Sequence, residues 1–147
     1  PNAARGDLAI ALWAFVQAQK PTWQVDLHEG GGVRSEGSKS VGSSVIVFPE
    51  PETDAAAALM LTAVNATITN RTHRFVRLTG PVAGSLTRAA GERVGAHAMI
   101  LETTSKDQPL SLRTRQHRLM VNTLLKHLGM INATVTPDWG LDHAMAP

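Results

Sequence analysis

The chain has 147 residues, enough for one domain with a hydrophobic core but few for two. With 43% hydrophobic and 18% charged residues its composition is that of a globular protein, and the absence of cysteine excludes disulfides and thiolate metal sites. The net charge is only +2, and three Phe, three Trp and no Tyr give no basic surface interleaved with aromatic residues, so we expect no nucleic-acid partner. No apolar run approaches the roughly 18 residues that span a bilayer, so we also expect no membrane partner.

The apolar pattern predicts helices and strands in alternation. A helix is expected at 7–19, where apolar residues recur at helical spacing, and a proline ends it. A short buried strand is expected at 23–27, followed by a Gly- and Ser-rich loop at 29–44, a length that is uncommon in compact domains without a function. The next predicted elements are a strand at 45–48, a helix at 54–68, a strand at 75–78, a helix at 85–93 and a strand at 98–101.

The last predicted helix spans 112–128, with Leu124 and Leu128 facing inward and Arg113 facing outward. Because strands alternate with helices throughout, the predicted class is α/β, with a mostly parallel or mixed sheet flanked by helices. Residues 1–131 are predicted to form the domain and residues 132–147 a tail.

The first chemically informative segment is the strand end Asp26-Leu27-His28. Open α/β sheets bind ligands at the carboxyl ends of their strands, and a loop of small residues leaves space beside this one. Asp26 and His28 are two positions apart and share a face, so the carboxylate could orient the imidazole, as metal-bound histidines require. The alternative is a strand-end histidine that only hydrogen-bonds a carboxylate.

The second segment is the apolar strand that leads into Glu102. An unpaired charge is costly to bury, so Glu102 is either a surface residue just past the strand or a general base in a cleft. If the strands that carry His28 and Glu102 are parallel, both groups lie at one edge of the sheet. An imidazole ligand and a proton-accepting carboxylate are two of the groups that a metal-activated water requires.

These two segments resemble the zinc carboxypeptidases and the related succinylglutamate desuccinylase and aspartoacylase deacylases. In that superfamily a strand ending in D-L-H supplies the third zinc ligand, which matches His28, and a later strand supplies the catalytic glutamate, which matches Glu102. A long closing helix matches 112–128, and the resemblance covers roughly 8–130. It implies a zinc-carboxypeptidase-like fold that lacks its N-terminal part, with residues 1–131 as the C-terminal part of a metallohydrolase-like domain.

The chain also departs from the family pattern. No histidine is followed by glutamate at the third position, as in the H-x-x-E motif that supplies the first two ligands. No Asn-Arg pair precedes His28, and the tyrosine that the peptidase members use is absent. Pro1 falls where the family chain has just passed the Asn-Arg pair. We therefore expect a C-terminal fragment whose companion chain is the missing N-terminal portion, inactive by itself because one histidine does not hold zinc tightly.

The resemblance implies hydrolysis of an amide bond, in a small peptide or an N-acyl amino acid, by a zinc-bound water. His28 would be a zinc ligand, Asp26 its support, and Glu102 the group that takes the water's proton and returns it to the leaving amine. Arg34, in the loop after His28, could clamp a substrate carboxylate, and the alternative is an ordinary solvated loop charge.

Two other functions compete with hydrolysis. The chain could be a non-catalytic binding module that retains the fold. A nucleotide-binding domain is less well supported, because the glycines at 30–32 are not followed by the Lys and Ser/Thr of a phosphate loop, and no helix is predicted to begin there.

Overall fold

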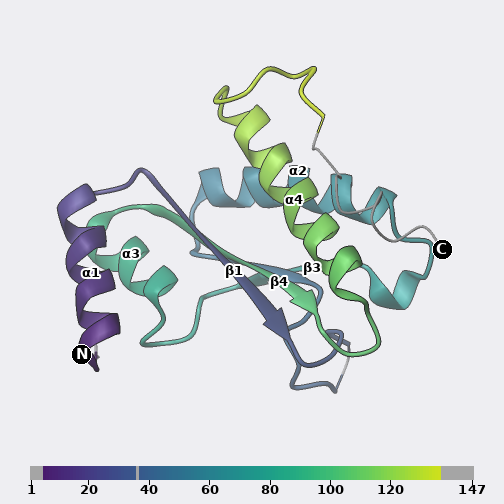
Figure 1. Cartoon of the computed structure of the whole chain (residues 1–147), viewed down its shortest axis with the longest axis horizontal. Helices are drawn as coiled ribbons and strands as arrows, with labels where there is room; N and C mark the ends of the chain where they lie inside the picture. Colours follow the sequence, from purple (N-terminus) through teal and green to yellow (C-terminus); the bar gives the residue numbers. More distant parts are fainter. Residues whose placement is uncertain (1–4, 36, 137–147) are drawn as a thin grey trace.

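The structure, a computed structural model, describes residues 5–35 and 37–136 and has the predicted α/β architecture with a mixed sheet (Figure 1). Its elements in chain order are α1 (Asp7–Gln19), β1 (Trp23–Gly30), β2 (Ser44–Val47), α2 (Pro51–Ala66), the 3-10 turn η1 (Arg71–His73), β3 (Val76–Thr79), α3 (Leu86–Val94), β4 (His97–Thr104) and α4 (Leu110–His127). No helix in these ranges is both long and apolar enough to cross a membrane.

The sheet has the strand order β1-β4-β2-β3. β1 pairs in parallel with β4, and β2 pairs in parallel with β3, while the central pair β4 and β2 is antiparallel. The parallel pairing of β1 and β4 brings their carboxyl ends to the same edge of the sheet. The carboxyl ends of β1 and β4, and the loop that leads into β2, therefore build one end of the molecule.

Helices cover both faces of this sheet. α2 and α4 pack on one face, where the main core lies (Figure 1). That core is built mainly from Val45, Val47, Ala56, Ala57, Met60, Val64, Phe75, Met99, Leu101, Met120 and Leu124. On the opposite face α3 packs its small residue Ala90 against Ala98 and Phe48, and α1 contacts α3. Because side chains alternate along a strand, the residues of β4 next to Leu101 face the α3 side.

Local chemistry explains where several helices begin and end. α2 begins at Pro51, three residues before the predicted start, because proline is well suited to the first helical turn, where its missing N–H is not needed. Ser85 caps α3, its hydroxyl accepting a hydrogen bond from the backbone N–H of Arg88 at 3.1 Å. Gly95 ends α3 in the left-handed conformation at φ 72°, which glycine adopts without strain.

Some predictions about burial are wrong. β1 was predicted to be buried, but it lies at the edge of the sheet, and its Leu27 is 51% exposed. In α1 only Val16 is buried, because the helix contacts the rest of the chain mainly through α3. Arg113 was predicted to face solvent, but its side chain is only 16% exposed, because it pairs with Glu29.

The glycine-rich loop between β1 and β2 is tied to the end of β4. The N–H of Arg34 donates to the carbonyl of Gly42 at 2.8 Å, and the N–H of Ser105 donates to the carbonyl of Gly30 at 2.9 Å. An added Cβ at Gly42 would lie 2.6 Å from Oγ1 of Thr104, so only glycine allows this close approach. The predicted tail 132–147 lies outside the described residues from 137 onward.

Candidate active site

Three of the four residues proposed from the sequence gather at the carboxyl ends of β1 and β4. His28 and Glu102 are direct partners in the parallel register, and Asp26 is the partner of Ile100, two residues earlier. Residues in register on neighbouring parallel strands point to the same face, so the three side chains share the α3 face of the sheet. The register thus brings together groups that are separated by 74 residues in the sequence.

His28 lies between the two carboxylates. Its Nε2 is 3.4 Å from Oδ1 of Asp26, and its Nδ1 is 4.0 Å from Oε1 of Glu102. The His28 side chain is 55% exposed, whereas that of Glu102 is 7% exposed. A carboxylate at one ring nitrogen orients the ring and leaves the other nitrogen for a ligand. The geometry therefore presents Nδ1 toward Glu102 and toward solvent.

Glu102 is a buried carboxyl group within the strand, not a residue just past it: β4 continues to Thr104. Its Oε2 has no hydrogen-bond partner among the described protein atoms. Burial raises the pKa of Glu102 above its ordinary value, the charge on His28 lowers it by less, and Asp26 raises it further. A carboxyl group that titrates closer to neutrality is suited to accepting and returning a proton.

The opposite face of the same strand ends is held by α4. Arg113 pairs with Glu29, the residue after His28. One helical turn later, Nε2 of His117 lies 3.0 Å from the carbonyl oxygen of Leu101, directly before Glu102. Burial lowers the pKa of His117, so its ring favours the neutral form, which can still donate one N–H. The two contacts connect α4 to the side chain of Glu29, next to His28, and to the backbone carbonyl of Leu101, next to Glu102.

Hydroxyl groups line the boundary between the loop and β4. Oγ of Ser43 and Oγ1 of Thr104 are 2.9 Å apart and buried, and Ser43 has a φ of 55°, in the left-handed region. Ser44, which pairs with Glu102, donates its hydroxyl to the carbonyl of Val41 at 2.6 Å. These contacts fix the start of β2 against the end of β4. No local sequence pattern indicates the contact of Ser43 with Thr104, because the two residues are 61 positions apart.

Arg34, the fourth residue proposed from the sequence, is not brought to this group. Its Nη1 donates to the carbonyl oxygen of Ser38 at 2.9 Å, within the loop and exposed to solvent. Within the described ranges, no contact joins Arg34 to His28 or Glu102. A role for Arg34 in substrate binding would therefore require the loop to rearrange.

The residues at this end fit one part of a zinc site. Zinc sites in proteins use three or four nitrogen, oxygen or sulfur ligands at about 2.0–2.3 Å. His28 fits one ligand position, because Asp26 supports its Nε2 and leaves its Nδ1 available. Asp26 and Glu102 lie at opposite nitrogens of the ring, so the three side chains do not converge on one point. Any further zinc ligands must come from outside this group.

A separate group of potential metal ligands lies at the other end of β4. Glu50, Glu52 and His97 offer one ligand atom each, and the three atoms all lie within 4.8 Å of one another. No local spacing in the sequence connects His97 to the two glutamates. The residues that the structure describes therefore contain a group that could hold a metal ion, although it does not include His28.

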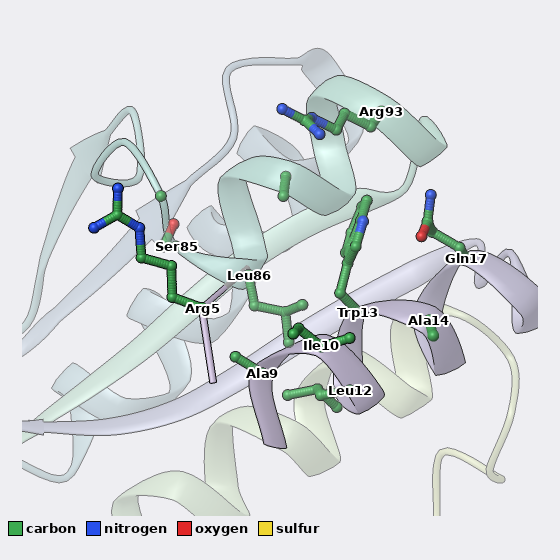
Figure 2. A pocket seen from close by; sticks show the side chains of 12 residues that line it. Arg5, Ala9, Ile10, Leu12, Trp13, Ala14, Gln17, Ser85, Leu86 and Arg93 are labelled. Atoms are coloured by element: carbon green, nitrogen blue, oxygen red, sulfur yellow. The ribbon is translucent and has the colours of Figure 1, made fainter. Parts of the chain in front are cut away.

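A hollow in the described surface does not include His28. It has a volume of about 730 Å³ and lies between α1 and α3 (Figure 2). Ile10 and Trp13 of α1 and Leu86 of α3 line it, with Arg5 and Arg93 at its margins. None of the three clustered site residues contributes to it. The hollow is an apolar groove between two helices rather than part of the candidate active site.

The α/β fold of the chain is similar to that of solved structures. No family model and no curated protein matches the chain. The chain is similar to the product-bound cell shape determinant protein Csd4 from Helicobacter pylori, with a TM-score of 0.72 and 20% identity. The match covers 97% of this chain and 41% of Csd4, so the chain spans well under half of the length of that neighbour.

Other structures of Csd4 give the same result. The mDAP-bound form, described as a D,L-carboxypeptidase, matches with a TM-score of 0.63 and 19% identity, over 87% of this chain and 37% of that chain. The tripeptide-bound form matches with a TM-score of 0.66 and 19% identity, over 97% of this chain and 41% of that chain. The similarity supports the predicted α/β fold with a mixed sheet flanked by helices, and it does not extend to the zinc carboxypeptidase and deacylase superfamily.

Proposed function

We propose that this chain is the portion of a zinc-dependent, carboxypeptidase-like amide hydrolase that carries one metal ligand, His28, and the catalytic carboxylate, Glu102. The observation that carries the proposal is the Nδ1 of His28 facing Oε1 of Glu102 at 4.0 Å. This pair lies at the carboxyl ends of two parallel strands, where α/β sheets bind ligands. The fold shared with Csd4 supports the same assignment.

The roles of the residues follow from their surroundings. A bound zinc ion would act as a Lewis acid and activate water. Asp26 keeps the His28 ring oriented through Nε2. Glu102, whose pKa burial raises, accepts a proton from the attacking water and returns it to the leaving amine. Arg113 pairs with the side chain of Glu29 beside His28, and His117 contacts the backbone carbonyl of Leu101 beside Glu102.

The proposed substrate is a small peptide with a free carboxyl end. Csd4 is described with mDAP and with a tripeptide bound, and peptides of this kind are the first substrates to test. An N-acyl amino acid remains the alternative substrate, because the same acid–base pair cleaves either amide. A companion polypeptide would supply the remaining zinc ligands and a basic group for the substrate carboxylate.

A second candidate function is a non-catalytic binding module. The observation that favours it is that the described residues at the strand ends offer a single imidazole ligand, too few for a tight zinc site. A module of this kind would bind a peptide without cleaving it.

The experiment compares zinc content and hydrolysis in protein purified together with any companion polypeptide, which a denaturing mass spectrum reveals. We expect His28→Ala to lower zinc per chain, and Glu102→Gln to retain zinc and lose hydrolysis of mDAP-containing tripeptides by at least 100-fold. His127→Ala, at an exposed histidine in the last turn of α4, is the matched control. Zinc content that is unchanged by His28→Ala would refute the assignment, and binding without cleavage would favour the module.

A further inference from the structure

A group of three side chains lies at the end of the sheet opposite the candidate active site. Glu50 precedes α2, Glu52 lies in its first turn, and His97 begins β4. β4 runs from His97 to Glu102 and beyond, and at about 3.3 Å per residue the two groups are about 16 Å apart. The group is therefore independent of the proposed zinc ligand His28.

The backbone around this group is fixed by contacts of its own. The N–H of His97 donates to the carbonyl of Thr22 at 2.8 Å. The ring of Trp23 packs on the imidazole, with the ring centroids 4.8 Å apart. The side chains of His97 and Glu50 are about three-quarters buried, at 25% and 24% exposure. The imidazole is thus held in place, and its surroundings are only partly hydrated.

Neither glutamate makes the contact that its position at the start of α2 would predict. Glu50 is at the N-cap of α2, where short polar side chains usually bond the helix N–H groups, but it makes no such bond. It instead contacts Nδ1 of His97. Asp54, the other acid of this first turn, is paired with Arg77 at 2.5 Å, whereas within the described part of the chain no basic side chain pairs with Glu52.

The carboxylates of Glu50 and Glu52 are close enough to repel each other, and the N-terminus of α2 relieves only part of that repulsion. A divalent cation would relieve the rest. One imidazole nitrogen and two carboxylate oxygens suit zinc and neighbouring transition metals, whereas calcium takes six to eight oxygens. Ligands of zinc at about 2.0–2.1 Å lie about 3.3 Å from one another, so donors within 4.8 Å need only small side-chain rotations.

We propose that Glu50, Glu52 and His97 form a second, structural metal site for zinc or a similar divalent transition metal. It would connect the β2–α2 turn to the start of β4, because its ligands come from both. The proposal does not depend on the assignment of His28 and Glu102.

The test is isothermal titration of the metal-stripped chain with zinc chloride, with magnesium chloride as a comparison. We expect one zinc site in the wild-type chain, and an affinity at least tenfold weaker in Glu52→Gln and in His97→Gln. Glu52 is exposed, so its variant keeps the fold even if His97→Gln does not. Glu92→Gln, at an exposed carboxylate of α3, is the matched control and should bind as the wild type does.

His28→Gln separates the two sites. If it leaves the affinity unchanged while Glu52→Gln weakens it, the site assigned here is supported. If His28→Gln removes the binding and Glu52→Gln does not, the zinc belongs to the candidate active site and this assignment is wrong. The assignment is also overturned if Glu52→Gln and His97→Gln bind zinc as tightly as the wild type. It is equally overturned if the wild-type chain binds no zinc at about 1 mM, roughly the weak limit of specific binding.

Discussion

Replacing Glu102 by glutamine should make the protein more stable at pH 8 while removing the proposed catalytic carboxylate. The side chain is 7% exposed, its Oε2 has no hydrogen-bond partner among the described protein atoms, and its Oε1 is 4.0 Å from Nδ1 of a half-exposed His28. A polar group left unsatisfied in the interior costs about 1–3 kcal/mol, and a charged group costs more. The neutral amide keeps the shape and removes the charge, so we expect a gain of about 1–2 kcal/mol in the free energy of unfolding.

The pH dependence has a definite sign. Burial raises the pKa of Glu102 in the folded state, so the folded protein holds this proton more tightly than the unfolded chain does. The wild type is therefore most stabilised by this group below the ordinary pKa of glutamate, and loses that stability as the pH rises through the raised folded value. The advantage of the glutamine variant should be small at acidic pH, grow across this window and stay constant above it.

Urea unfolding followed by circular dichroism between pH 4 and pH 8 measures both quantities. Glu92→Gln is the control, because Glu92 is exposed and paired only with Arg88 on the helix surface, where an ion pair contributes at most about 0.5 kcal/mol. The reasoning is refuted if Glu102→Gln is less stable than the wild type at pH 8, or if the difference between them does not change with pH. The first result would mean that Glu102 stabilises the fold as a charged group, and the second that its pKa does not differ between the folded and unfolded states.

Two further substitutions test close contacts within the fold. Gly42→Ala should lower the free energy of unfolding by about 1–3 kcal/mol, because the new methyl group meets a backbone oxygen at 2.3 Å and Oγ1 of Thr104 at 2.6 Å. Urea unfolding measures this loss. An unchanged free energy of unfolding would show that the loop moves freely. Asn65→Ala should lower the free energy of unfolding by about 2 kcal/mol. The Asn65 amide donates to the carbonyl of Phe75 at 2.9 Å and accepts from the Phe75 N–H at 2.7 Å, and about 1 kcal/mol is typical for each bond. A loss below about 0.5 kcal/mol in a thermal melt would contradict this.

Elements that consist of short apolar runs are predicted well from the sequence. β2 and most of β4 are such runs, and the structure confirms the α/β class and the mixed sheet. Parallel strands of similar length then bring His28 and Glu102 into register, as the sequence analysis required. The chemical roles of these residues remain predictions, because their positions show proximity and not reaction.

What could not be predicted depends on strand order. An apolar strand has the same sequence pattern in the middle of a sheet as at its edge, so β1 was wrongly predicted to be buried. Arg113 was expected to face solvent, because its partner Glu29 is 84 positions away and no local pattern connects the two residues. The group formed by Glu50 and His97 is separated by 47 positions and has no local spacing that could indicate it.

The energetics of the strand ends favour a functional explanation for Glu102. A buried carboxyl group with an unsatisfied oxygen lowers stability, and proteins retain such groups mainly where function requires them. Its neighbour His28 lies on an edge strand, where a long unpaired edge invites association. A companion segment docked along β1 would place its own ligands beside Nδ1 of His28 and exclude water from Glu102. The same step would thus complete a zinc site and strengthen the electrostatic interactions inside it.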